Sequence, residues 1–367
     1  MDVSFGDAAG HAKSPVLAPY TATQLVLPEQ LAQQAADAVR ELLAEAAAAN
    51  TTRSYAAALR YWAGWHQGRY GIELELPVSE VVVIQFLVDH IQRRSKAELV
   101  SELPPTLDQA LVAAGLKAKV GPLKLSTVVQ RVAVLSTAHK LKRLANPCEL
   151  PSVLTLLSRA RRAAVKRGER PVKKTAITRA ELEAMLATCD DSLEGLRDRA
   201  LLCFGFASGG RRRSEIAAAD MRDLRKVAED GYIYRLEYSK TQQAGVTADS
   251  TPDKPILGRS AEALSYWLEA AGIQEGALFR RIWKGRVGPA LLPGSVAAIV
   301  KRRARLAGLD GDFGSHSLRS GFVTEAGKQG VPLPAVMAMT EHRSVASVIG
   351  YFQAGAAEDN PAARLLK

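Results

Sequence analysis

The segment LRDRALLCFGFASGGRRRSEIAAADMRDL, which runs from Leu196 to Leu224, decides the fold of the second half of the chain. Its apolar start predicts a helix over Leu196 to Leu202, within a compact domain that begins near Ile177. Three consecutive arginines follow the apolar run. The middle one, Arg212, begins the pattern Arg-x-Ser-Glu, and its rigid guanidinium fork fits two oxygens of a phosphate. The segment therefore predicts a helix that leads into a phosphate-binding arginine.

Five later residues suit the same chemistry. His316 and Arg319 share one helix face at a spacing of three, Lys240 would lie at the tip of a hairpin, and Tyr351 follows nine residues after His342. Cleaving a DNA strand without a metal requires positive charge at the non-bridging oxygens, an in-line nucleophile and a proton for the departing 5′ oxygen. The two arginines suit the first task, with His342 as a further donor. Tyr351 suits the second and Lys240 the third.

A free tyrosine has a pKa of about 10, so Tyr351 needs a cationic pocket or a nearby base to attack at neutral pH. We expect the two arginines and the two histidines to supply both. The resulting 3′-phosphotyrosine would preserve the energy of the broken phosphodiester, and a 5′ hydroxyl of a partner strand could then reseal it. Because this chemistry needs no cofactor and no metal, the sequence predicts neither.

The composition is that of a globular protein with a polyanionic partner. The chain has 367 residues, 47% hydrophobic and 24% charged, which is enough for two domains with sizeable cores. Its 49 Lys and Arg against 38 Asp and Glu leave a formal charge of +11, which favours nucleic acid over an acidic membrane surface. There is no apolar run of about 18 residues and no leader with a basic stretch before an apolar core. We expect a cytoplasmic protein without membrane contact.

The three cysteines, Cys148, Cys189 and Cys203, lie far apart in the sequence and form no CxxC or Cys/His pattern. This spacing predicts neither a disulfide framework nor a zinc site. We expect all three to be reduced packing residues.

The texture of the sequence divides the chain into four regions. They are a flexible tail over residues 1–25, a helical DNA-binding domain over 26–167, a basic linker over 168–176 and a catalytic domain over 177–367. Within the helical domain, residues 50–52 (Asn-Thr-Thr) predict a helix stop and a new N-cap. Further helices are expected over 78–93 and 126–144. The aromatic residues Tyr61, Trp62 and Trp65 recur at helical spacing, which is typical of a core face.

A basic helix is expected over residues 152–167, and basic residues continue into the linker. A run of charge is often only a solvated helix face, but this one lies between two expected domains of a basic protein. We expect it to contact DNA phosphates, which would anchor and orient the DNA without reading its sequence. The residues expected to do so are Arg159, Arg162, Lys166, Arg167, Lys173 and Lys174.

In the second domain, Thr178 is expected to cap the first helix. Residues 232–238 alternate as a strand should, and a return strand is expected near residues 254–257. From Ala261 to the end of the chain the pattern reads as helices.

The ordered set of residues resembles the active-site signature of the tyrosine recombinases, the phage integrase family. The resemblance is strong from residue 177 onward, and the helix around Tyr61 and Trp65 is similar to one in the core-binding domain of Cre-type members. Glu215 matches an acidic residue that supports the active-site cations. The six catalytic positions of the family are matched by Arg212, Lys240, His316, Arg319, His342 and Tyr351.

The resemblance implies a mainly α, two-domain clamp. Its N-terminal domain would be a SAM-like helical core-binding domain, and its catalytic domain would carry a small three-stranded antiparallel sheet that holds the lysine. It implies a site-specific recombinase that acts on double-stranded DNA with inverted-repeat half-sites. It further implies a homo-oligomer, with a dimer at each site and a tetramer in synapsis, associated with the nucleoid or a plasmid.

Three positions depart from the family pattern: Glu341 replaces a small glycine, Gly209 stands where a threonine is common, and Ser315 stands where many members have proline. None removes a reacting group, although Glu341 would alter the charge near the phosphate. The stretch from Ser95 to Lys124 is longer than the matching connection of Cre-like members. Either an added contact surface or a plain surface insertion would account for it.

Two other functions remain open at this point. A type IB topoisomerase uses the same chemistry to relax supercoiled DNA, and a non-catalytic DNA-binding regulator would use the fold without the nucleophile. The Cre-like N-terminal half favours recombination over the first. The second predicts that Tyr351→Phe leaves the biological activity intact.

Overall fold

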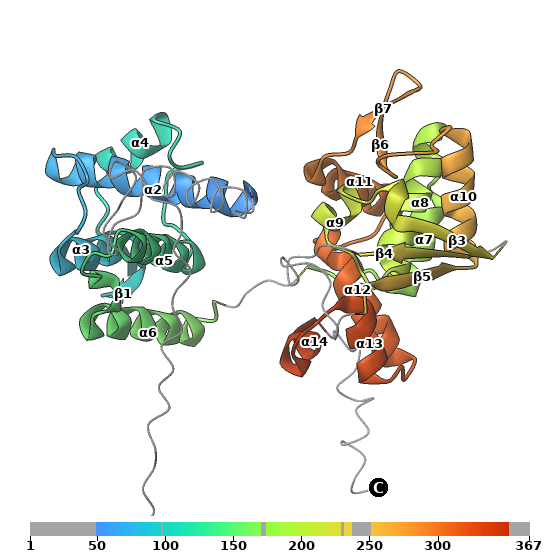
Figure 1. The fold of residues 1–367 in the computed structure, drawn as a ribbon. Coiled ribbons are helices and arrows are strands. Elements are labelled where there is room, and N and C mark those ends of the chain that lie inside the picture. The colour runs from blue at the N-terminus through green and yellow to red at the C-terminus, as the bar shows by residue number, and fades with distance from the viewer. Residues whose placement is uncertain (1–48, 97, 170–173, 229–230, 237–250, 352–367) are drawn as a thin grey trace, which may run out of the picture. The chain divides into compact units, whose positions relative to one another are not determined.

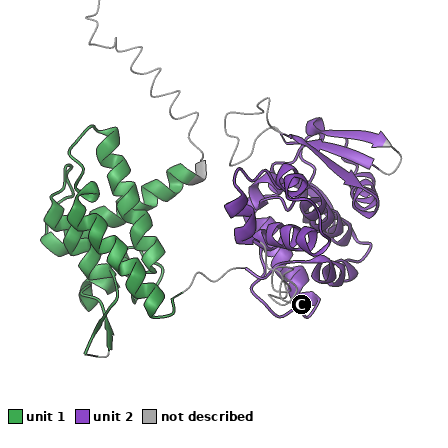
Figure 2. Ribbon diagram, turned by 90° about the horizontal axis from the view of Figure 1, so that it is seen from below, with its two compact units in different colours: residues 1–171 green, residues 172–367 purple. Residues whose placement is uncertain are grey.

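The computed structural model describes residues 49–96, 98–169, 174–228, 231–236 and 251–351. The chain divides into two compact units, Met1–Pro171 and Val172–Lys367, which Figure 2 shows in two colours. Among the described residues, none of the helices is both long enough and apolar enough to cross a membrane.

The N-terminal unit is a bundle of helices (Figure 1). Its core is aromatic: Tyr61, Trp62 and Trp65 are fully buried, and the Trp62 ring stacks on Phe86 with 3.7 Å between the ring centroids. The expectation that these aromatic residues form a core face is confirmed. The elements of this unit are α2 (Ala49–Tyr70), α3 (Glu80–His90), β1 (Arg93–Ser95), β2 (Glu98–Val100), α4 (Pro105–Ala113), α5 (Leu125–Leu141), η2 (Pro147–Glu149) and α6 (Pro151–Lys166).

Residues 50–52, where a helix stop and a new N-cap are expected, lie in the first turn of α2 as the structure describes it. The segment expected to stop there precedes Ala49 and lies outside the described residues. The long stretch after Ser95 holds β2 and α4, and α4 buries Leu107 and Leu111 in the aromatic core. The stretch therefore forms part of the domain core and is not only a surface insertion.

The C-terminal unit is mainly helical and contains the expected three-stranded antiparallel sheet, in the order β3-β4-β5. Thr178 and Glu181 form the capping box at the start of the first helix, as expected. The elements are α7 (Arg179–Ala187), α8 (Leu193–Ala207), α9 (Arg213–Ala217), η3 (Met221–Asp223), β3 (Leu224–Ala228), β4 (Gly231–Arg235), β5 (Asp253–Leu257), α10 (Arg259–Ala270), β6 (Arg280–Trp283), β7 (Arg286–Ala290), α11 (Pro293–Leu306), α12 (Ser315–Lys328), α13 (Leu333–Thr340) and α14 (Val345–Tyr351).

The expectation of helices alone after Ala261 is wrong, because β6 and β7 form a hairpin there. Its turn contains Lys284 and Gly285, both with positive φ. The hairpin carries four arginine and lysine side chains in a short span, and so lacks the clean apolar alternation that identifies a strand in sequence. The three cysteines are free and buried, as expected. Burial raises the pKa of Cys148 to about 12.

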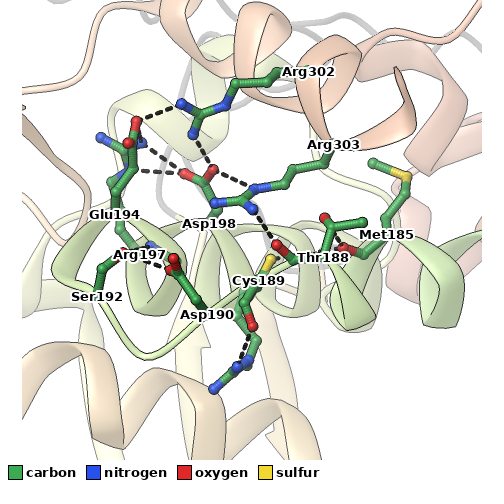
Figure 3. Close-up of polar contacts among 12 residues, drawn as sticks. Met185, Thr188, Cys189, Asp190, Ser192, Glu194, Arg197, Asp198, Arg302 and Arg303 are labelled. Atoms are coloured by element: carbon green, nitrogen blue, oxygen red, sulfur yellow. Dashed lines mark hydrogen bonds and ion pairs between the residues drawn. The ribbon is translucent and has the colours of Figure 1, made fainter. Parts of the chain in front are cut away.

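A buried ion cluster joins α8 to α11 (Figure 3). The Asp198 carboxylate is fully buried and accepts hydrogen bonds from Arg197 at 2.7 Å, Arg302 at 2.5 Å and Arg303 at 2.7 Å. Arg302 also donates to Glu194 at 2.5 Å. Because one carboxylate holds arginines from two helices, the cluster fixes α11 against the helix that leads into the candidate site.

Candidate active site

Arg212 is placed by a tight turn at the end of α8. Gly209 and Gly210 have φ values of +95° and +68°, which glycine adopts without strain. A Cβ atom on Gly210 would lie only 2.3 Å from the Arg319 Cα, so the turn brings the start of α9 directly against α12. The Arg212 side chain remains 18% exposed, and its Nη1 donates to Glu215 Oε1 at 2.6 Å.

Glu215 forms ion pairs with both Arg211 and Arg212. Its Oε2 accepts a hydrogen bond from the Arg212 backbone N–H at 3.1 Å and lies 3.8 Å from Nη1 of Arg211. Burial opposes the charged form of this carboxyl, but Arg211 and Arg212 outweigh it and hold its pKa below the usual value. Glu215 is therefore a buried carboxylate that pairs with Arg211 and Arg212.

Arg319 is almost completely buried on α12. Its Nη1 donates to the Gly210 carbonyl at 3.3 Å, its Nη2 donates to the Thr340 carbonyl, and its Nε lies 3.4 Å from His342 Nε2. Burial, with repulsion from two neighbouring arginines, lowers the pKa of Arg319 to about 10. A guanidinium in this position gains stability when an anion binds next to it.

The hydrogen bonds of His342 fix its tautomer. The Thr340 hydroxyl donates its one proton to the Val336 carbonyl at 2.7 Å, so it must accept a hydrogen bond from His342 Nδ1, which lies 2.7 Å away. In the neutral ring, Nε2 then carries a lone pair, which faces the Arg319 Nε. Burial, followed by repulsion from Arg319, lowers the pKa of His342 to about 4. The residue is therefore neutral at neutral pH and can accept a proton at Nε2.

Tyr351 ends α14 beside this histidine. The rings of Tyr351 and His342 lie 5.1 Å apart, centroid to centroid, at an interplanar angle of 46°. The tyrosine is half-buried and packs on a small apolar cluster that includes Val336 and Val348. Its charge acts on Arg319, since the phenolate form of Tyr351 raises the pKa of that arginine. The structure thus gathers Arg212, Arg319, His342 and Tyr351 in one place.

The other expected site residues differ in what the structure says of them. His316 lies one turn before Arg319 in α12 and is exposed. Lys240 and Lys173 lie outside the described residues. Lys174 forms an ion pair with Asp312 inside the C-terminal unit, so its charge is already partnered there.

The basic helix expected over residues 152–167 is confirmed as α6. Arg159, Arg162 and Lys166 are exposed on it. Arg167, at its end, donates to Glu169 at 2.8 Å. Three of the four basic residues expected to face DNA on this helix are therefore open to solvent, and the fourth is paired.

Two buried cations at the site were not singled out in the sequence. Arg211 is 1% exposed and donates from Nη2 to the Met339 carbonyl at 2.5 Å, and Lys254 is fully buried beside Glu341. A signal for Lys254 was present: it alternates in phase with buried Ile256 along β5, which places it on the inner face of the strand. No pattern in the sequence distinguishes Arg211 from the two arginines that follow it.

The cationic side chains of the site are suited to bind an anion, and the phenol of Tyr351 lies beside them. Arg211 and Arg212 both pair with the single carboxylate of Glu215, and both repel the nearby Arg319, so positive charge is in excess before Lys254 and Glu341 are added as a pair. Within the described part of the chain, no group of three or more His, Cys, Asp or Glu residues is arranged to hold a metal ion.

The chain is similar in sequence to known proteins. The sequence model of the phage integrase family matches residues 175–358. An integrase/recombinase xerD homolog from Selenomonas ruminantium is 29% identical over 324 residues, which cover 85% of this chain and 84% of that protein.

Two solved structures share the fold. A lambda integrase dimer bound to a COC′ core site has a TM-score of 0.53 at 16% identity, covering 88% of this chain and 95% of that one. The Tn1549 transposon integrase in complex with transposon right end DNA has a TM-score of 0.52 at 14% identity, covering 87% of this chain and 93% of that one. At these identities the likeness concerns the fold alone.

Proposed function

Because the chain belongs to the phage integrase family and is a tyrosine-type site-specific DNA recombinase, we propose that it cleaves and rejoins DNA through a covalent 3′-phosphotyrosine on Tyr351. The observation that carries this proposal is the gathering of Arg212, Arg319 and His342 around the phenol. Arginine forks neutralise the non-bridging oxygens of a phosphodiester, and a phenol placed beside them can attack the phosphorus.

The first step begins when the scissile phosphate enters between Arg212 and Arg319. Its negative charge relieves the repulsion that lowers the pKa of Arg319, so binding is favoured electrostatically. The same charge raises the low pKa of His342, whose Nε2 can then accept the phenolic proton. Once protonated, that Nε2–H can donate a hydrogen bond to the phosphate. His342 therefore accepts at Nε2 in the neutral form, where the structure has a long hydrogen bond from Arg319, and donates from the same nitrogen once it is protonated.

In the second step the Tyr351 oxygen forms a bond to phosphorus and the bond to the 5′ oxygen breaks. The departing oxygen takes a proton, which we assign to Lys240. The reverse reaction, with a 5′ hydroxyl of another strand as nucleophile, reseals the backbone and returns Tyr351 to its free form. Since each phosphodiester broken is replaced by another, no nucleotide is consumed. Integration, excision and resolution of a DNA element all follow from such exchanges.

We propose duplex DNA with inverted-repeat half-sites as the substrate. The solved relatives support DNA as partner, since one is a lambda integrase dimer bound to a core site and another a transposon integrase in complex with transposon end DNA. The exposed arginines and lysine of α6 and the formal charge of +11 suit contacts with the DNA backbone. Paired strand exchange further requires a dimer on each site and a tetramer across two.

The test is to trap covalent adducts. The protein and its Tyr351→Phe variant are incubated with sheared DNA of the source organism, denaturation-resistant adducts are isolated, and their DNA ends are sequenced. Adducts at one short inverted-repeat site, absent from the variant, are the expected result. Scattered adducts would favour a topoisomerase, and adducts that persist in the variant would exclude Tyr351 as the nucleophile.

A second measurement tests the general acid. A DNA substrate with sulfur in place of the bridging 5′ oxygen has a leaving group that needs no proton. Lys240→Ala should cleave normal DNA slowly and the sulfur substrate at nearly the wild-type rate. An equally slow reaction on both substrates would remove Lys240 from this role.

A further inference from the structure

The C-terminal end of α13, two residues before His342, is held by cations from three other elements. Lys254 Nζ donates to the Ala338 carbonyl at 2.8 Å, Arg211 Nη2 donates to the Met339 carbonyl, and Arg319 Nη2 donates to the Thr340 carbonyl. The last carbonyls of a helix lack partners within it and carry its negative dipole end. Positive groups therefore satisfy them and fix the direction in which the chain leaves the helix.

The next residue, Glu341, has an unusual backbone for its type. Its φ of 58° lies in the left-handed region, where a non-glycine residue costs about 1–2 kcal/mol. A glycine would be free of this strain, and the family pattern has a small glycine here. A side chain retained at a strained position next to a site residue points to a contact that the side chain makes.

That contact is an ion pair with Lys254. The Glu341 Oε1 lies 3.3 Å from Lys254 Nζ, and the two side chains are 5% and 0% exposed. Within the described residues, neither carboxylate oxygen of Glu341 has a conventional hydrogen-bond donor, so the lysine is its principal charge partner. A buried carboxylate without a cation is strongly disfavoured. The two residues therefore depend on each other.

Lys254 is also fixed at its other contacts. Its ammonium donates to the carbonyls of Thr251 and Ala338, and the Thr251 hydroxyl donates to the same Ala338 carbonyl at 3.0 Å. The lysine belongs to β5, which pairs with β4. One buried ammonium thus connects the sheet, the end of α13 and the residue that precedes His342.

We propose that Lys254 and Glu341 are positioning residues that hold the end of α13 so that His342 meets Arg319 and Tyr351. The pair contributes no reacting group and, being buried, does not contact DNA. Glu341 neutralises Lys254, so the cations left to bind phosphate are the arginines of the site. This inference rests on the proposed phosphotyrosine reaction.

Three variants test the pair in the full-length protein. Lys254→Met keeps the length of the side chain and removes the ion-pair partner of Glu341, and Glu341→Gln does the converse. A displacement of about 1 Å in a site group typically slows a reaction up to about 100-fold. We expect both single variants to slow single-turnover cleavage about 10- to 100-fold at saturating protein, with DNA affinity changed less than about two-fold. Assays run well below the thermal midpoint of each variant.

The double variant Lys254→Met/Glu341→Gln is the matched control. It removes both charges together, so its folding stability should recover relative to Lys254→Met. The effects on cleavage should be non-additive, with the double variant no slower than the worse single one. Additive losses would show that the two residues act independently and would overturn the pair.

The sulfur-bridged substrate separates this role from that of Lys240. Because the pair acts through His342, sulfur should leave Lys254→Met as slow as before while it restores Lys240→Ala. Rescue of Lys254→Met by sulfur would contradict the assignment to His342. Wild-type cleavage rates in Lys254→Met, whatever its thermal midpoint, would reduce the pair to a purely structural element.

A readout that needs no activity keeps the inference separate from the proposed reaction. Nitrogen NMR of the histidine side chains, with His342→Gln to assign the signal, reports the tautomer and pKa of His342 directly. In the wild type we expect the Nδ1–H tautomer and a pKa of about 4. In Lys254→Met the pKa should rise toward the ordinary 6.5 and the tautomers should mix.

If the His342 signal of Lys254→Met matched that of the wild type, the positioning role would be overturned, even with a wild type that cleaves DNA normally. If the wild type forms no adduct at all, the proposed reaction fails, and the NMR comparison still decides whether the pair positions His342.

Discussion

Two buried arginine clusters in the C-terminal unit differ in how their charge is matched. Between α8 and α11, three arginines converge on Asp198, and Glu194 supplies a second carboxylate (Figure 3). At the candidate site, Arg211 and Arg212 pair with Glu215, and Arg319 directs its hydrogen bonds to two carbonyls and to His342. In the first cluster every arginine contacts a carboxylate, whereas in the second Arg319 contacts only neutral acceptors.

The pKa values of the arginines show the same contrast. Burial lowers the pKa of Arg302, but hydrogen bonds with Glu194 and Asp198 outweigh it and raise the value above normal. For Arg319, burial and two neighbouring arginines act in the same direction and lower the pKa to about 10. The contrast indicates that a cation paired with its own carboxylates stabilises the fold, while a buried cation held among other cations is suited to bind an anionic ligand.

The largest expected effect comes from removing the charge of Arg319 at the candidate site. Arg319→Gln should slow strand cleavage about 1,000-fold, since loss of one donor to a developing anion typically costs that much. Its folding stability should fall by much less than the cleavage rate does, because removing a buried charge that has no carboxylate partner offsets part of the loss of two hydrogen bonds to carbonyls. Single-turnover cleavage and urea unfolding measure the two quantities. Arg302→Gln is the matched control: it should lower the folding stability and leave the cleavage rate nearly unchanged. Equal losses of cleavage in the two variants would contradict the distinction between the two clusters.

Breaking the Asp198 cluster should act on stability instead. Asp198→Asn leaves three arginines facing a neutral amide, and removing one partner of a buried ion cluster typically costs about 3–5 kcal/mol. Urea unfolding followed by circular dichroism should detect this loss. If the variant unfolded like the wild type, the cluster would not be what fixes α11 to α8.

An added anion should sharpen the contrast. Inorganic phosphate at ten times its dissociation constant stabilises a protein by about 1.4 kcal/mol. We expect phosphate to raise the thermal midpoint of the wild type and of Arg302→Gln, but not of Arg319→Gln. An equal shift in all three proteins would locate the binding elsewhere.

The smallest expected effect is the pH dependence due to His342. Its pKa is lowered to about 4 in the folded protein against 6.5 for an ordinary histidine, so the unfolded chain binds the proton more tightly. The contribution of His342 to the free energy of unfolding is fully present above pH 6.5 and is lost as the pH falls toward 4. Because the ring is only half-buried, screening reduces the effect to a few tenths to about 1 kcal/mol. The stability difference between wild type and His342→Gln, followed from pH 7 to pH 4, checks the sign; a variant that is more sensitive to acid would contradict it.

Much of the fold was readable in the sequence because its signals are local. The capping box at Thr178, the alternation along β4 and the aromatic face of α2 each depend on residues within a few turns of one another. The family signature likewise placed Arg212, Arg319, His342 and Tyr351 in the chain, and the structure brings these four together.

What the sequence did not reveal depends on contacts between distant segments. The ion pair of Lys254 and Glu341 joins residues from a strand and a helix end far apart in the chain, and no local pattern marks it. The β6–β7 hairpin has no strand-like sequence pattern, because β6 begins with two arginines and β7 contains glycine and proline, so apolar side chains do not alternate cleanly along either strand.

The most direct test of the account is to identify the residue that becomes linked to DNA. Trypsin should release the peptide from Ser344 to Arg364, in which Tyr351 is the sole tyrosine. After nuclease digestion of a trapped adduct, mass spectrometry should find a 3′-nucleotide on this peptide and on Tyr351 within it. A nucleotide on any other residue, or one linked through its 5′ phosphate, would contradict the account.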